Sequence, residues 1–119
     1  MKLLLVTFSL RNLNKDYNSF FVTVRGNVYN WWHFIEQTIV VSTSFDAESF
    51  AHLLYPHLET TDSLLVVEIQ PHQFQGWLPK AAWDWLWNTS WKIAEEKKLL
   101  SSETVPSVLP PPPKQTPNH

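Results

Sequence analysis

Cysteine is absent from the 119 residues of this chain. Its absence excludes disulfides, thiolate zinc sites and cysteine nucleophiles together. A chain without disulfides suits a reducing compartment, and we expect a cytoplasmic location. Glycine is nearly as scarce, with two residues, so the sequence contains no glycine-rich loop of the kind that cradles phosphates.

Basic residues are also few. Nine Lys and Arg residues stand against eleven Asp and Glu residues, which gives a net charge of −2 and a pI of about 6.2. Proteins that bind nucleic acid usually carry a basic surplus, because each neutralised phosphate releases counterions. The net charge therefore gives no support to nucleic acid as a partner, although the net charge would not reveal a local basic patch.

Long hydrophobic runs are missing as well. No run approaches the roughly 18 residues that a membrane-spanning helix requires, so no membrane partner is expected. Residues 1–6 resemble the start of a secretory signal, but Ser9 and Arg11 interrupt the run and no small-residue cleavage site follows. A buried first strand is the favoured interpretation of this segment.

Aromatic residues, by contrast, are abundant. Seven Trp and seven Phe are present, and each ring buries a large area, so a short chain can form a core. We predict one domain over residues 1–98. Residues 99–119 include the run Pro110–Pro113 and are predicted to form a disordered tail. Docking of this tail in an SH3-like groove is the alternative.

Short apolar runs predict four strands, and apolar stripes at helical spacing predict two helices between them. The strands are expected at residues 3–8, 31–34, 38–42 and 64–69. The first helix is expected to follow an N-cap at Asn14 and to stop at Gly26, although residues 21–24 also have strand propensity. The second should begin near Asp46 and end near Tyr55, because the following proline would break an interior hydrogen bond.

This order of elements predicts a ferredoxin-like βαββαβ fold of the α+β class. Its four-stranded antiparallel sheet carries both helices on one face, so the other face needs a cover. Beyond residue 69, Pro79 suits the first position of a further helix. Trp83, Leu86, Trp87 and Trp91 then recur at helical spacing, which predicts an additional C-terminal Trp-rich helix.

Several short segments over residues 1–90 resemble the small proteins labelled SinR-like. The segments are Lys15-Asp16-Tyr17, Trp31-Trp32-His33-Phe34, the strand at residues 64–69, and Gly76-Trp77-Leu78-Pro79 together with Trp83. Those proteins are similar in fold to the CRISPR-adaptation protein called the second Cas protein. The resemblance implies a ferredoxin-like domain that is commonly dimeric, with the segment after the fourth strand helping to join subunits. It implies no activity, and the sequence shows no helix-turn-helix pattern.

One departure from the CRISPR-related pattern concerns catalysis. Those families typically carry an Asp just after the first strand, and the paired carboxylates of a dimer can hold a divalent metal for phosphodiester cleavage. Ser9 stands in the matching stretch here. A neutral hydroxyl is a poor replacement for a carboxylate, so metal-dependent nuclease activity by that route is doubtful.

Aromatic residues supply the candidate site. Trp31 and His33 should share one face of a strand, with Trp32 and Phe34 on the other. A stacking platform for single-stranded bases is one interpretation. The favoured one is core packing combined with a subunit interface or with a cover for the extra helix. The remaining predicted interface residues are Trp77, Trp83, Trp85, Trp87 and Trp91, of which Trp85 lies off the helical stripe.

No catalytic motif is present, and no cofactor, metal site or small-molecule ligand is predicted. His33 and Glu36 are three residues apart, so in a strand their side chains point to opposite faces and cannot converge. The favoured hypothesis is a homodimeric interaction or assembly protein without a catalytic site. The alternative is a nucleic-acid-binding protein or metal-dependent nuclease related to the CRISPR-adaptation family.

Overall fold

The computed structural model describes residues 1–103, with side chains for residues 1–99. The described chain divides into two compact units, Met1–Gln70 and a second unit that begins at Pro71. The single domain predicted for residues 1–98 spans both units, and their joining stays a prediction. The predicted tail lies outside the described residues from residue 104 onward.

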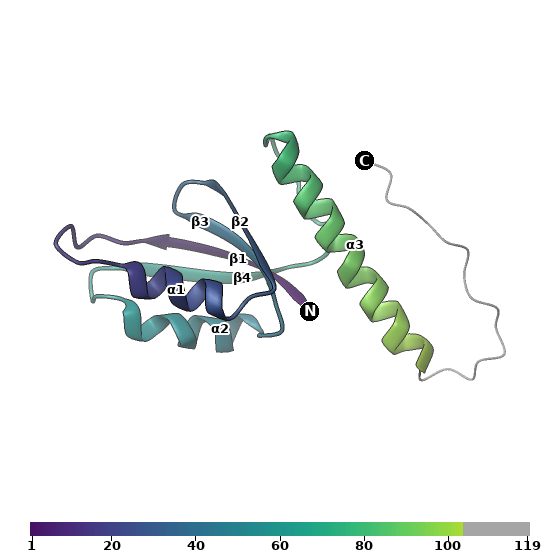
Figure 1. Ribbon diagram of the computed structural model, residues 1–119, viewed down its shortest axis with the longest axis horizontal. Coiled ribbons are helices and arrows are strands. Elements are labelled where there is room, and N and C mark those ends of the chain that lie inside the picture. Colours follow the sequence, from purple (N-terminus) through teal and green to yellow (C-terminus); the bar gives the residue numbers. More distant parts are fainter. Residues whose placement is uncertain (104–119) are drawn as a thin grey trace. The chain divides into compact units, whose positions relative to one another are not determined.

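The first unit is a small α+β fold (Figure 1). Each predicted strand is present and extends one residue further at one or both ends. The elements are β1 (Lys2–Ser9), α1 (Asn18–Gly26), β2 (Asn30–Ile35), β3 (Thr38–Thr43), α2 (Ala47–Leu54), the 3₁₀ turn η1 (Tyr55–His57) and β4 (Ser63–Ile69).

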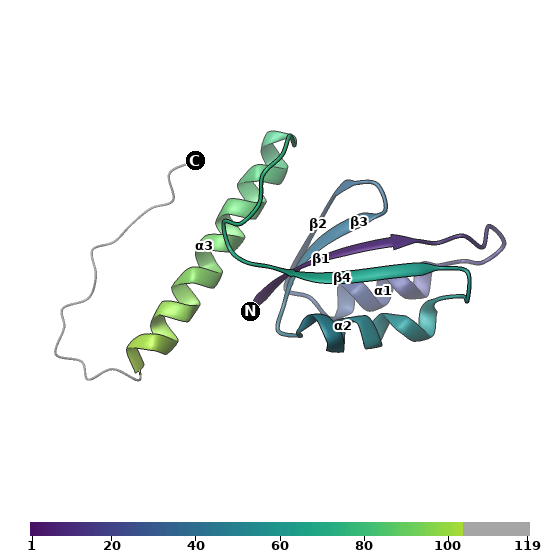
Figure 2. The ribbon, with the colours of Figure 1, turned by 180° about the vertical axis from the view of Figure 1, so that it is seen from behind.

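The four strands form one antiparallel sheet in the order β2-β3-β1-β4. Both α1 and α2 lie on the same face of this sheet, as the two opposite views agree (Figures 1 and 2). The register pairs Leu4 with Val41 and Val6 with Ile39, which directs these four side chains to the helix-covered face. The predicted α+β class with a four-stranded antiparallel sheet is therefore confirmed.

The core lies between that face and the two helices. Phe20 of α1 and Phe50 of α2 are fully buried in it. Phe8 on β1 meets Phe20 edge-on at 5.2 Å between ring centroids, and Phe21 closes the cluster at 5.8 Å from Phe8. Such edge-to-face pairs add about 0.5–1.5 kcal/mol beyond the area they bury.

Residues 18–26 form the predicted helix rather than the competing strand. Phe20 and Val24, four residues apart, fall on one side of α1 and are buried there, so the helical stripe outweighs the local strand propensity. The predicted N-cap at Asn14 is wrong, because α1 begins four residues later. The amide of Asn14 instead donates to the Asn12 side chain at 3.0 Å, and Asp16 accepts from the amide of Asn18 at 2.9 Å.

The start and end of α2 match the prediction. Asp46 is the N-cap, and its carboxylate accepts a 2.8 Å hydrogen bond from the amide of Ser49. This hydrogen bond lowers the pKa of Asp46 below its ordinary value. Pro56 falls in η1, immediately after the last α-helical turn, as expected for a residue that cannot continue the helix.

The turn between β2 and β3 consists of Glu36 and Gln37, as predicted without an Asn-Gly signal. Gln37 adopts a φ of +59°, in the left-handed region that side chains other than glycine rarely occupy. Its carbonyl accepts a 3.0 Å hydrogen bond from the amide of Phe8. This contact to β1 helps to hold the unfavourable conformation in place.

The second unit contains the predicted Trp-rich helix, α3 (Lys80–Glu103). The carbonyl of Pro79 accepts hydrogen bonds from the amides of Ala82 and Trp83 at 3.0 and 3.2 Å, so proline stands immediately before the first helical residue, Lys80, one position earlier than predicted. Helix α3 continues to Glu103, five residues past the predicted boundary at 98. Among residues 1–103, no helix is both long and apolar enough to cross a membrane.

Candidate functional site

Strand β2 is an edge of the sheet, since β3 is its only neighbour. Its sequence, Asn30–Ile35, contains no Lys, Arg, Asp, Glu or Pro, the residues that normally protect an edge from pairing with another chain. Trp31, Phe34 and Ile35 are 42%, 47% and 45% exposed. We call the segment Asn30–Ile35 the β2 edge.

The predicted site residues Trp31 and His33 both belong to the β2 edge. Trp31 stands opposite Val41 and Trp32 opposite Val40 in β3, so the two indoles point to opposite faces of the sheet. The ring of Trp32 contacts that of Phe34 at 5.3 Å. The register shifts after Trp32, and His33 lies exposed in this irregular stretch.

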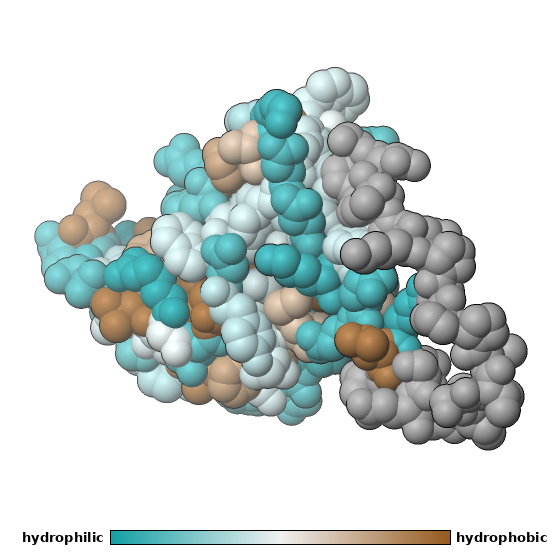
Figure 3. Space-filling model, turned by 45° about the vertical axis from the view of Figure 1, so that its right-hand side comes forward, coloured by the Kyte–Doolittle hydropathy of each residue, from teal (hydrophilic) through white to brown (hydrophobic). Residues whose placement is uncertain are grey.

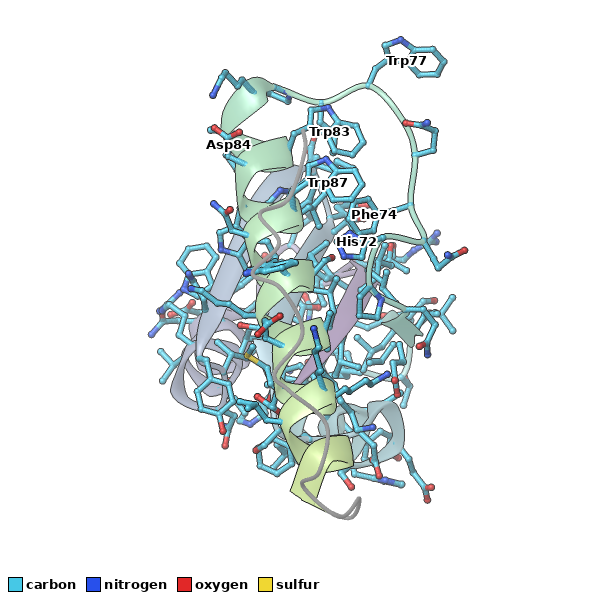
Figure 4. All side chains as sticks on the ribbon, turned by 90° about the vertical axis from the view of Figure 1, so that its right-hand side faces the viewer. His72, Phe74, Trp77, Trp83, Asp84 and Trp87 are labelled. Carbon is cyan, nitrogen blue, oxygen red and sulfur yellow. The ribbon has the colours of Figure 1, made fainter. Side chains whose placement is uncertain are left out.

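The second unit brings two of the predicted tryptophans together. Trp83 and Trp87, one turn apart on α3, face two rings from residues 71–79, a segment without regular secondary structure (Figure 4). His72 stacks on Trp87 at 5.0 Å between centroids, and Phe74 lies 5.3 Å from Trp87 and 6.2 Å from Trp83. We call these four residues, His72, Phe74, Trp83 and Trp87, the aromatic ladder.

The chain reaches the aromatic ladder through two unusual backbone positions. His72 has a φ of +64° and Gly76 a φ of +155°, and the latter conformation is accessible mainly to glycine. The amide of His72 donates to the hydroxyl of Ser90 at 3.4 Å, which fixes the start of the segment against α3. The rings of His72 and Phe74 both face α3, where each contacts Trp87.

The other predicted tryptophans of this unit lie outside the ladder. Trp77 is 97% exposed and points away from the rings that Figure 4 labels. Trp91 is half-buried two turns beyond Trp83. Trp85, predicted to lie off the stripe, is half-buried, and its indole N–H has no hydrogen-bond partner among the described residues.

The surface view shows a face of mixed hydropathy (Figure 3). In Figure 3 pale residues of intermediate hydropathy cover much of the visible face, while strongly hydrophobic residues form separate spots. Tryptophan and tyrosine belong to this intermediate class, because each ring carries a polar group. Side chains of this kind are enriched at protein interfaces.

A hydrogen-bonded cluster that the sequence did not predict joins η1 to α1. The ring of His57 lies between two hydroxyls, with Nδ1 3.0 Å from Ser19 Oγ and Nε2 3.0 Å from Thr23 Oγ1. Thr23 Oγ1 donates to the carbonyl of Ser19, so it accepts from Nε2, and Nδ1 in turn accepts from Ser19. Both ring nitrogens are therefore engaged by α1, which makes this imidazole a clamp between the two elements.

A second polar cluster surrounds Asp62. Its carboxylate accepts hydrogen bonds of 2.8 Å from the amides of Arg11 and Glu59, and it also faces the Tyr17 hydroxyl. Partial burial raises the pKa of Asp62, but these hydrogen bonds outweigh burial and the pKa lies below its ordinary value. Partial burial, together with the negative charge of Asp62, raises the pKa of Tyr17 despite a hydrogen bond from Asn12 that lowers it.

A shallow groove of about 690 Å³ borders α2 and η1. Its lining includes Tyr55, Leu58 and the carboxylates of Glu59 and Asp62. Because Asp62 is already saturated by the hydrogen bonds described above, its carboxylate is a structural group here. One of the two carboxylates that line the groove is therefore engaged in hydrogen bonds within the fold.

No group of three or more His, Asp and Glu side chains gathers as a metal site within residues 1–103. The hydroxyl of Ser9, at the position where a metal-binding Asp is expected from the resemblance, accepts a 3.2 Å hydrogen bond from Nε of Arg11. A guanidinium at this distance opposes the binding of a cation, because like charges repel.

The described fold and these surfaces define a small α+β protein with an exposed, uncharged sheet edge and an aromatic helix. Comparison with known proteins adds no family to this description: no family model, no curated protein and no solved structure matches the chain.

Proposed function

We propose that this protein is a homodimeric interaction or assembly module without a catalytic centre, and that the β2 edges of two copies pair to form the dimer. The single observation that carries the proposal is an exposed edge strand with no charged residue and no proline. Unpaired N–H and C=O groups along such a strand form hydrogen bonds readily with a second strand.

The opposite edge of the sheet differs in its charge. Strand β4 carries Glu68, which forms a salt bridge of 3.5 Å with Lys2 of β1. A charged residue on an edge strand protects that edge from pairing with another chain. The β2 edge carries no such charge, and its exposed Trp31, Phe34 and Ile35 would gain burial on pairing.

The dimer we propose would turn two four-stranded sheets into one continuous sheet of eight strands. Main-chain hydrogen bonds would supply the affinity and alternate side chains the register, as in other complexes formed by strand addition. The predicted interface residues Trp31 and His33 lie within this strand, and so do Phe34 and Ile35.

We also propose that the fold is ferredoxin-like and that the resemblance to the SinR-like proteins is one of common architecture. The element order β1, α1, β2, β3, α2, β4 supports this, as does the placement of β1 and β3 at the centre of the sheet. Nuclease activity is not part of the proposal, since Arg11 occupies the neighbourhood of Ser9.

Sedimentation equilibrium over a range of concentrations tests the dimer. We expect the wild-type chain to form dimers and Ile35→Lys to remain monomeric at the same concentrations, because a lysine on the edge prevents strand pairing. Leu65→Lys is the matched control: Leu65 is 58% exposed on β4, at the other edge, and this variant should dimerise normally.

Two results would contradict the proposal. A monomeric wild-type chain at the highest concentrations would remove the dimer altogether. If Leu65→Lys dissociates the dimer and Ile35→Lys leaves it intact, the interface lies at β4 and not at the β2 edge. Circular dichroism spectra of both variants establish that each retains the fold before its mass is interpreted.

A further inference from the structure

The hydroxyl of Ser19 and the ring of His57 form the pair of groups that an activated serine nucleophile requires. Ser19 Oγ lies 3.0 Å from Nδ1 of His57, and on the other side of the ring Nε2 lies 3.0 Å from Thr23 Oγ1. A nucleophile within hydrogen-bond reach of a base, with the base oriented by a third group, is the arrangement that activates serine hydroxyls. Ser19 is exposed, and the other two residues are half-buried, so a reagent can reach the nucleophile.

The hydrogen bonds of Thr23 fix the tautomer of His57 that this role needs. The Thr23 hydroxyl donates its one proton to the carbonyl of Ser19 at 2.8 Å, so it accepts from Nε2. Nδ1 of the neutral ring then directs its lone pair at the Ser19 hydroxyl, 3.0 Å away. This nitrogen can therefore take up the hydroxyl proton when Ser19 attacks a carbonyl carbon.

The backbone around both partners supports the same chemistry. His57 ends η1, directly after Pro56, and its carbonyl accepts a 2.8 Å hydrogen bond from Nζ of Lys15. Ser19 is the second residue of α1, in the first turn, where amides lack intrahelical acceptors and the helix dipole is positive. Negative charge that develops on a carbonyl oxygen during attack by Ser19 therefore forms near this positive end.

We propose that Ser19 is a covalent modification site that accepts an acyl group from an activated ester. Ser19 Oγ forms a bond to the acyl carbon, and the bond from that carbon to the leaving oxygen breaks. His57 Nδ1 takes the hydroxyl proton and passes it to the leaving oxygen or to water.

The network favours a single acylation of each chain over repeated turnover. Its third member, Thr23, is a neutral hydroxyl, whereas the carboxylate of a catalytic triad stabilises the imidazolium that forms at each step. The acyl group should therefore accumulate on Ser19. Neither Ser19 nor His57 belongs to the β2 edge, so the modification site is independent of the proposed dimer.

Treatment of the full chain with p-nitrophenyl acetate tests the proposal, with mass spectrometry of peptides to locate the acetyl groups. We expect acetyl-Ser19 to accumulate in neutral buffer. Ser49 is the matched control within the same chain, because it is also an exposed serine in the first turn of a helix, α2. Its hydrogen-bond partner is the carboxylate of Asp46 instead of an imidazole, so it should stay unmodified.

Two substitutions distinguish a base from a purely structural clamp. His57→Asn places an amide oxygen where Nδ1 accepts from Ser19, but this oxygen cannot take up a proton. The acetylation rate of Ser19 should therefore fall by about 100-fold or more. Thr23→Val removes the group that orients the ring and should also slow the reaction, whereas Thr23→Ser retains a hydroxyl and should restore the rate. Circular dichroism spectra establish that each variant retains the fold.

Acetylation of Ser19 that is no faster than that of Ser49 would overturn the proposal. This comparison is made within the wild-type chain and does not depend on the folding of a variant. Equal acetylation rates of Ser19 in the wild-type chain and in folded His57→Asn would also overturn it, because the imidazole would then be a structural group alone.

Discussion

The hydroxyl of Tyr17 donates to the carboxylate of Asp62, and both oxygens of that carboxylate lie 2.9 Å from it. The two residues are 45 positions apart in the sequence. Asp62 also accepts the amide of Arg11, directly after β1, and the amide of Glu59, in its own loop. One carboxylate therefore joins the connection between β1 and α1 to the connection between η1 and β4.

Removal of the Tyr17 hydroxyl should destabilise the first unit. In Tyr17→Phe the carboxylate loses one donor while its other partners remain, so we expect a measurably lower free energy of unfolding in urea. Tyr55→Phe is the control, because the Tyr55 side chain is 72% exposed. Equal midpoints for Tyr17→Phe and the wild-type chain would contradict the structural role of this pair.

The lowered pKa of Asp62 predicts a loss of stability in acid. A carboxyl group with a lower pKa in the folded than in the unfolded state stabilises the fold above the unfolded value of about 3.9. That contribution disappears as the pH falls through the lower, folded pKa. Urea unfolding of the wild-type chain should therefore show a decrease in stability below about pH 4.

The Asp62→Asn variant isolates this contribution. It should be less stable than the wild-type chain at neutral pH and should show a smaller further decrease in acid, because the titrating group is gone. Glu36→Gln, in the exposed turn between β2 and β3, changes one carboxylate in the same way and should retain the wild-type pH dependence. Parallel pH profiles for wild type and Asp62→Asn would contradict the assignment.

Phe20 should be among the most sensitive positions of the core. It is fully buried and packs edge-on against both Phe8 and Phe21, so Phe20→Ala should lower the free energy of unfolding by about 3–5 kcal/mol. Val22→Ala, at a half-exposed position of the same helix, should change it by no more than about 0.5 kcal/mol. Chemical denaturation of the three chains provides the comparison.

The sequence was sufficient for the elements of the first unit because each has a distinct apolar period. Phe20 and Val24 identified α1 even though residues 21–24 favour a strand, since burial of one helical side decides between the two. The position of the N-cap was not predictable in the same way. Asn12, Asn14 and Asp16 all have suitable side chains, and the actual geometry depends on the distant contact between Tyr17 and Asp62.

The site was predictable only where neighbours in space are also neighbours in sequence. Trp83 and Trp87 share a helical face because they are four residues apart, and the sequence pattern found both. His72 and Phe74 join them only because the chain reverses between Gly76 and Lys80, a tertiary event without a periodic signal. The clamp of His57 on Ser19 spans 38 residues and has no local signature.

The absence of cysteine allows a direct measurement of β2 edge pairing, since one introduced cysteine is the only thiol in the chain. In an antiparallel pair of identical strands, residues near the two-fold axis meet their own copies at Cβ distances suited to a disulfide. Single substitutions at Trp31, Trp32, His33 and Phe34, each to Cys, are oxidised and the covalent dimer is quantified. Val22→Cys on α1 and Leu65→Cys on β4 are the controls.

The proposal predicts rapid formation of the covalent dimer at one or two adjacent positions of the β2 edge, with slow formation in both controls. Cross-linking that is no faster along β2 than at Val22, or that is fastest at Leu65, would contradict pairing of the β2 edges.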